Sequence, residues 1–91
     1  MRMLSEKELQ EYMKSFNNKN VVFSFGGIVR ARIVMKNAEC VYYRKVGILK
    51  VNDNNTELSI DISSAYKILT SENNTMLKIY LDNDIEIIME K

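Results

Sequence analysis

The chain lacks histidine, proline and tryptophan altogether, and it has a single cysteine, Cys40, among its 91 residues. Histidine is the commonest general acid–base in enzymes and a frequent metal ligand. Its absence excludes Ser-His-Asp and Cys-His catalytic arrangements. We therefore expect a protein that is not an enzyme, with no catalytic, cofactor-binding or metal-binding residues.

A lone cysteine cannot form an internal disulfide. A cysteine within a β-prone run is usually a small buried apolar residue rather than a nucleophile. No stretch approaches the roughly 20 apolar residues that span a bilayer, and residues 1–8 carry charges without an apolar run. We expect a cytoplasmic protein with no membrane partner and no evident small-molecule substrate. The abundance of Asn, Ile and Lys indicates an AT-rich bacterial genome.

The chain does contain enough apolar material for one small domain. Hydrophobic residues make up 46% of it, and a chain of this length can bury a core without disulfides or metals. We expect a single domain over residues 1–91. Its class is mostly β (α+β), with an N-terminal helix followed by a curved antiparallel sheet or small open barrel of five to seven strands.

The N-terminal helix is marked by a capping box, Ser5 followed by Glu8, in which each side chain satisfies a backbone N–H of the other residue. Leu4 before the cap and Leu9 after it fit a hydrophobic staple. One apolar stripe then follows at helical spacing, formed by Leu9, Tyr12, Met13 and Phe16. The pattern predicts a helix over about residues 6–16, docked on the rest of the protein.

The remainder of the chain is typical of strands and turns. Val21–Phe25 and Ile28–Met35 are β-prone runs separated by Gly26-Gly27. This spacing predicts either a hairpin or one long strand that is kinked or bulged at the glycines. A third run covers residues 40–51, with a bend at Gly47. Period-2 alternation of apolar and polar residues predicts further strands over residues 57–62, 77–82 and 85–90, and Tyr66–Thr70 is a further strand candidate.

Charge is divided along the chain although the net charge is only +1. Residues 30–50 contain one acidic residue, Glu39, and six basic residues: Arg30, Arg32, Lys36, Arg44, Lys45 and Lys50. Residues 51–91 contain eight acidic and three basic residues. Such asymmetry bears on partners and association. The two segments either pair across strands inside the molecule or form complementary surface patches.

The favoured function is a non-enzymatic interaction module that self-associates or binds a protein partner. Ile88 lies on the polar side of the last predicted strand, between Glu86 and Glu90, so these three residues are candidate interface residues. In a two-fold dimer, residues 30–50 of one chain would meet residues 51–91 of the other. The last strand would pair edge to edge with its copy or with a strand near Arg30.

The alternative function is binding of single-stranded RNA. Arg30 and Arg32 share one face of a predicted strand, and Arg44 and Lys45 follow the tyrosines 42–43. Basic side chains beside aromatic rings hold single strands by phosphate contact and base stacking. The pI near 7.8 is below that of most nucleic-acid-binding domains.

Residues 40–62 resemble part of the Sm-like and SH3-like small β-barrels. Gly47, Leu49 and Asp53 have the spacing of the first Sm motif, and Leu58 and Ile60 follow in the next strand. The resemblance implies a bent sheet of five or six strands and a ring or dimer made by strand pairing. It carries no RNA site over, since Glu57 replaces the motif's Asn and nothing resembles the second motif.

Overall fold

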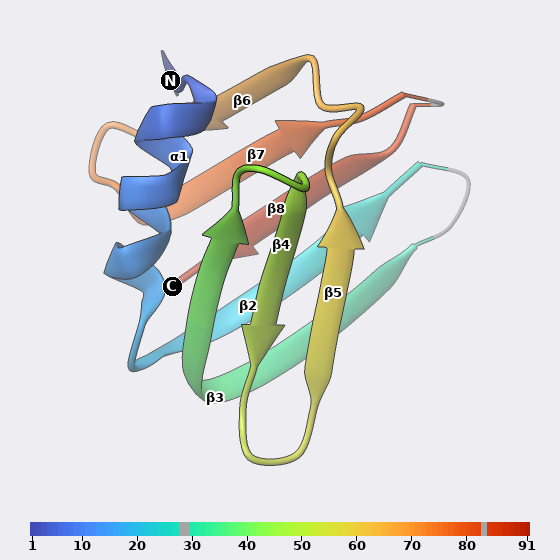
Figure 1. Ribbon diagram of the computed structural model, residues 1–91. Helices are drawn as coiled ribbons and strands as arrows, with labels where there is room; N and C mark the ends of the chain where they lie inside the picture. Colours follow the sequence, from blue (N-terminus) through green and yellow to red (C-terminus); the bar gives the residue numbers. More distant parts are fainter. Residues whose placement is uncertain (28–29, 83) are drawn as a thin grey trace.

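The computed structural model describes residues 1–27, 30–82 and 84–91, which form an α-helix, a 3₁₀ turn and eight strands (Figure 1). In chain order these are β1 (Arg2–Met3), α1 (Glu6–Met13), the 3₁₀ turn η1 (Lys14–Phe16), β2 (Lys19–Gly26), β3 (Ala31–Tyr43), β4 (Ile48–Asn52), β5 (Glu57–Asp61), β6 (Lys67–Thr70), β7 (Met76–Tyr80) and β8 (Glu86–Glu90). The expected class, mostly β with an N-terminal helix, is confirmed.

The helix begins at the predicted capping box. The Ser5 hydroxyl accepts a hydrogen bond from the backbone N–H of Glu8, and the Glu8 carboxylate accepts one from the backbone N–H of Ser5. The turn η1 carries the helical segment to Phe16, where the sequence pattern ends. Leu9, Met13 and Phe16 are fully buried, so the apolar stripe faces the core as predicted.

The strands form one antiparallel sheet with the order β1-β6-β7-β8-β2-β3-β4-β5 in the described part of the chain. The sheet is open, because its two end strands do not pair with each other. The expected count of five to seven strands is wrong. The two-residue strand β1 has no periodic pattern of its own, and Gly47, with φ of +69°, divides residues 40–51 between β3 and β4.

The β2–β3 connection is a hairpin, which decides between the two interpretations of Gly26-Gly27. Phe25 pairs with Ala31 across the hairpin. The second strand begins at Ala31 rather than at Ile28, and residues 28–29 lie outside the described part of the chain. The connection is therefore longer than the two glycines alone.

The bend in this region lies instead in the middle of β3. The β2–β3 register shifts between Lys19 and Val21, so that Lys36 and Asn37 both lie opposite Asn20. An extra residue of this kind is a β-bulge, which bends a strand and increases its twist. Asn37 has φ of +53°, which Asn adopts more readily than most residues. Beyond the bulge β3 separates from β2 and pairs with β4, so the two halves of this strand belong to different parts of the sheet.

Side chains satisfy the backbone donors that the bulge frees. The N–H of Asn37 donates to Asn20 Oδ1 at 3.2 Å, and the N–H of Lys36 donates to Asp53 Oδ2 at 3.3 Å. The other carboxylate oxygen of Asp53 accepts the N–H groups of residues 55–56 in the β4–β5 turn. These hydrogen bonds, chiefly those from residues 55–56, lower the pKa of Asp53. Asp53 thus links a turn to the bend.

The bend produces two layers, with the core between them. The large layer contains β6, β7, β8, β2 and the first half of β3, and the small layer contains the second half of β3 with β4 and β5 (Figure 1). The helix α1 covers one side of the space between the layers (Figure 1). The largest fully buried side chains are Phe16, Phe23, Leu9, Met13, Met35, Leu49, Leu77, Ile79, Ile87 and Met89.

Candidate interaction surface

The three candidate interface residues lie on a strand in the interior of the sheet. In β8, Ile88 pairs with Lys78 of β7 on one side and with Ser24 of β2 on the other. The expectation that this strand pairs edge to edge with a second copy, or with a strand near Arg30, is therefore wrong, since hydrogen bonds within the chain occupy both of its edges. Glu86 and Glu90 point to the same face as Ile88, while the residues between them are buried.

That face is the side of the large layer turned away from the core, and we call it the outer face. Strand alternation assigns to it Val22, Ser24, Arg32, Val34, Lys67, Leu69, Met76, Lys78, Tyr80, Glu86, Ile88 and Glu90. The helix lies on the core side of the sheet (Figure 1). No described element covers the outer face.

The outer face carries a cluster of apolar side chains among its charged residues. The register aligns Met76, Glu90, Val22 and Val34 in one row across four strands, next to Ile88. Val34 exposes 54% of its surface. Antiparallel sheets with one wet face usually show polar residues at these positions. The sequence did contain a signal for this cluster, because Val22 interrupts the polar phase of its strand.

Charge changes sign across this face. β8 carries the acidic residues Glu86 and Glu90, and β3, two strands away, carries Arg32 beside Ser24. Lys78 of β7 forms a 3.9 Å ion pair with Glu86, whereas no ion pair of Glu90 or Arg32 is found in the described part of the molecule. The face therefore has an acidic centre and a basic margin with β2 between them.

The four basic residues proposed for RNA binding do not converge. Arg30 immediately precedes β3 and Arg32 is its second residue, whereas Arg44 and Lys45 lie in the turn after its end. Eleven residues of strand separate the two pairs in sequence, and the bulge directs the two halves of β3 into different layers. One continuous site made of all four residues is therefore not formed within a single chain.

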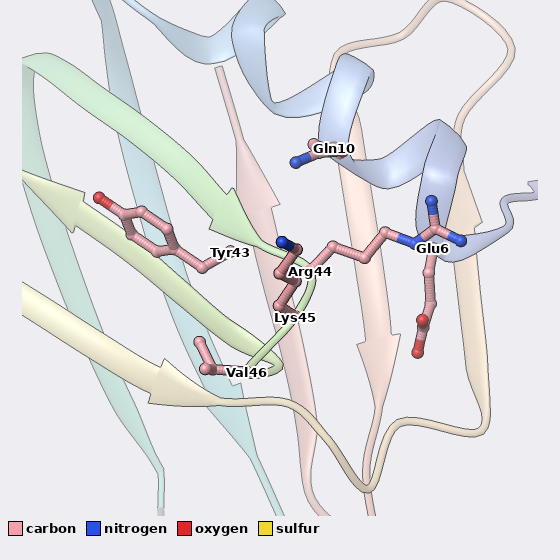
Figure 2. A pocket seen from close by; sticks show the side chains of 6 residues that line it. All are labelled: Glu6, Gln10, Tyr43, Arg44, Lys45 and Val46. Atoms are coloured by element: carbon pink, nitrogen blue, oxygen red, sulfur yellow. The ribbon is translucent and has the colours of Figure 1, made fainter.

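Arg44 and Lys45 instead border a hollow between α1 and the β3–β4 turn. Its volume is about 630 Å³, and Figure 2 shows the six side chains that line it, namely Glu6, Gln10, Tyr43, Arg44, Lys45 and Val46. The two neighbouring tyrosines differ in burial, since Tyr42 is 3% exposed and Tyr43 is 47% exposed. Burial raises the pKa of Tyr42, and the charge of Glu6 raises it further, against the opposite effect of Arg44. The hollow thus combines charges of both signs with one exposed ring.

The opposed charge segments are mostly not paired with each other inside the chain. Among the described residues, the ion pair between Lys50 and Glu57, at 2.7 Å, is the one that joins residues 30–50 to residues 51–91. Internal cross-strand pairing therefore accounts for little of the charge division. Most of it remains at the surface.

The described residues offer little catalytic chemistry. Burial raises the pKa of the Cys40 thiol to about 11, so it carries almost no thiolate at neutral pH. Residues 1–27, 30–82 and 84–91 contain no group of three or more Cys, Asp or Glu side chains placed to hold a metal ion. No helix in these ranges is long and apolar enough to cross a membrane.

The fold defines the chain as an open antiparallel β protein with one N-terminal helix. No protein-family model matches the chain, and neither the curated proteins nor the solved structures include a significant match. The resemblance of residues 40–62 to the Sm-like barrels therefore stays a prediction. Proposals about function depend on the surfaces described above.

Proposed function

We propose that this protein is a non-enzymatic interaction module that self-associates through the outer face of its large layer. The observation that supports the proposal is the position of Ile88. It lies near the middle of an uncovered face, beside the apolar cluster of Val22, Val34 and Met76, with acidic residues on its own strand and Arg32 two strands away. Uncovered apolar patches of this kind commonly mark protein interaction sites.

A two-fold axis can satisfy the charges of both copies at once. If the axis lies between two facing outer faces and runs along β2, rotation places β8 of each copy over β3 of the other. Arg32 then lies opposite Ile88 of the second copy, with Glu86 and Glu90 of that copy on either side. The same contact is made twice. An axis at right angles to the strands would instead place β8 over β8 and oppose like charges.

The size of the face sets the expected affinity. Five strands at a spacing of about 4.8 Å, each contributing about five residues, give a patch of roughly 20 by 17 Å. This footprint, about 340 Å² per copy, is smaller than the roughly 800 Å² per partner of standard stable interfaces and is in the range of weak, transient ones. We therefore expect a weak, reversible dimer that forms at high micromolar concentrations.

Sedimentation of the protein across micromolar concentrations tests the proposal. The wild type is expected to shift from monomer to dimer, and Ile88→Lys is expected to stay monomeric, because it places a second positive charge opposite Arg32. Ile88→Val is the matched control, since it keeps an apolar β-branched side chain. High salt is expected to weaken the dimer only modestly if apolar burial dominates. A wild type that sediments as a monomer throughout would contradict the proposal.

The second candidate function is binding of single-stranded RNA, and one observation favours it. Tyr43 is half-exposed beside Arg44 and Lys45 at the hollow in Figure 2, which places a stacking ring next to two phosphate-binding groups. Arg30 and Arg32 lie at the other end of β3, so they would contact a different part of a bound strand.

Anisotropy of a labelled oligonucleotide at two salt concentrations tests this alternative. If RNA is the ligand, reversing Arg30 and Arg32 to Glu abolishes binding, and raising salt weakens the wild type steeply. Tyr43→Ala removes the stacking surface and is expected to weaken binding without changing its salt dependence. If the Arg30 and Arg32 reversal, raised salt and Tyr43→Ala all leave binding unchanged, RNA binding by this surface is excluded.

A further inference from the structure

The strand β5 forms an open edge of the sheet. It pairs with β4 alone, at the end of the strand order. The hydrogen bonds from Ile62 N–H to the Gly47 carbonyl and from Asp53 N–H to the Thr56 carbonyl fix which residues face β4. By the antiparallel alternation, residues 58 and 60 also face β4. The N–H and C=O groups of Glu57, Ser59 and Asp61 therefore point away from the sheet.

Apart from the charges of Glu57 and Asp61, this edge lacks the features that usually protect edge strands. It is five residues long and contains no proline, lysine or bulge, whereas the opposite edge, β1, has only two residues. Figure 1 shows β5 as the outermost strand of the small layer. Its inward residues Leu58 and Ile60 pack against the core but remain only half-buried. An additional strand would cover them.

A second copy of β5 fits this edge poorly. Two-fold antiparallel pairing centred on Ser59 would place Glu57 opposite Asp61 of the other copy, and it would do so twice. Like charges directly opposite each other destabilise a strand pair. Lys50 neutralises part of the charge of Glu57 from the β4 side, but 60% of the Glu57 side chain remains exposed. Asp61 accepts hydrogen bonds from Ser63 and remains a carboxylate.

We propose that β5 accepts an extended basic segment of a partner protein as an additional strand of the small layer. Strand addition obtains its affinity from main-chain hydrogen bonds and its specificity from alternate side chains. The positions opposite Glu57 and Asp61 are four residues apart and require Lys or Arg. The positions opposite Leu58 and Ile60 face the core and require apolar residues. The recognised pattern is basic, apolar, small, apolar, basic, as in Lys-Val-Ser-Val-Lys.

A labelled peptide with the core Lys-Val-Ser-Val-Lys tests the proposal by fluorescence anisotropy. Ser59→Pro removes the central outward N–H and leaves the β4 ladder intact, because proline is tolerated where an edge N–H faces solvent. It is expected to weaken peptide binding at least tenfold. Ser59→Ala is the matched control and is expected to bind like the wild type. The peptide Glu-Val-Ser-Val-Glu is expected not to bind.

A second variant keeps the test decisive if Ser59→Pro fails to fold. Glu57→Gln combined with Asp61→Asn retains the side-chain shapes and removes the charges, so it is expected to weaken binding at least fivefold and to reduce its salt dependence. In the wild type, amide NMR shifts should change at residues 57, 59 and 61. Equal binding of both peptides, unchanged binding by Ser59→Pro, absence of saturable binding, or shifts confined to the outer face would overturn the proposal.

Discussion

Phe16 is the side chain that fixes the helical segment to the sheet. It is fully buried, its ring meets that of Tyr12 edge to face, and the Lys91 ammonium lies 4.9 Å from its centroid. Lys91 also donates hydrogen bonds to the carbonyl and the hydroxyl of Ser15. One residue near the N-terminal end of the chain thus joins a helix, the core and the last residue.

Phe16→Ala is expected to lower the free energy of unfolding by about 3–5 kcal/mol, because it removes a fully buried ring and leaves a cavity. Urea denaturation followed by circular dichroism measures the loss. Lys14→Ala is the control, since its side chain is exposed and its ion pair with Glu11 contributes about 0.5 kcal/mol or less. An unchanged midpoint for Phe16→Ala would mean that the helix is not docked.

At the scale of elements, the β3 bulge decides the architecture. Asn37 holds a left-handed backbone conformation at the point where β3 passes from the large layer to the small layer. Asn37→Gly is expected to leave stability within about 1 kcal/mol of the wild type, whereas Asn37→Val is expected to cost about 1–2 kcal/mol. Thermal unfolding of the two variants provides the comparison. Equal melting temperatures would show that the left-handed conformation is not required.

The link between the β4–β5 turn and the bulge predicts a pH dependence. Hydrogen bonding lowers the pKa of Asp53 below its ordinary value of 3.8, so its contribution to stability is present above that value and is lost as the pH falls through the lower, folded value. Asp53→Asn keeps the shape of the side chain but does not titrate. The difference in melting temperature between wild type and variant should be constant from about pH 5 to 8 and should shrink below about pH 4. A difference that persists at low pH would exclude Asp53 as the cause.

The elements differ in how far the sequence predicted them. The capping box and the stripe ending at Phe16 are local signals, so the helix was predicted to within its 3₁₀ end. Gly26-Gly27 was interpreted as either a hairpin or a bulge; it belongs to a hairpin, and the bulge that bends the sheet occurs at Asn37, where no bulge was predicted. That bulge is defined by the register of β3 against β2 and by a side chain of the distant Asp53. Local patterning contains neither kind of information.

At the scale of the whole molecule, the candidate surface also depends on which distant strands are neighbours, and local sequence patterns do not reveal this. Ile88, Glu86 and Glu90 could be identified from alternation within one strand. Val22 also departs from the polar phase of its own strand, but its position and that of Val34 beside Ile88 could not be predicted, because the sequence does not reveal that the last strand lies between β7 and β2. The division of charge was visible in the sequence, and on this face the fold places Glu86 and Glu90 on a central strand and Arg32 two strands away.

A charge exchange tests the proposed dimer geometry as a whole. Arg32→Glu alone and Glu90→Arg alone should each weaken association, because each places like charges together across the two-fold axis. The double variant should recover part of the lost association, since the contact between positions 32 and 90 is restored with opposite polarity while Glu86 remains beside the glutamate introduced at position 32. Sedimentation of the three variants at one concentration makes the comparison. If the double variant associates no better than the single variants, although all three are folded, the two faces pair in a different way.

Because β8 lies between two other strands of the sheet, the protein can be divided into a large piece and a short peptide that contains β8. A chain cut between residues 81 and 85 and separated from its last strand would leave unpaired edges on β7 and β2, and β8 pairs with both of them in the intact protein. The β8 sequence, supplied as a separate peptide, would restore a continuous core through Ile87 and Met89. The two pieces would behave as a split reporter, because the protein would fold only when the two pieces bind to each other.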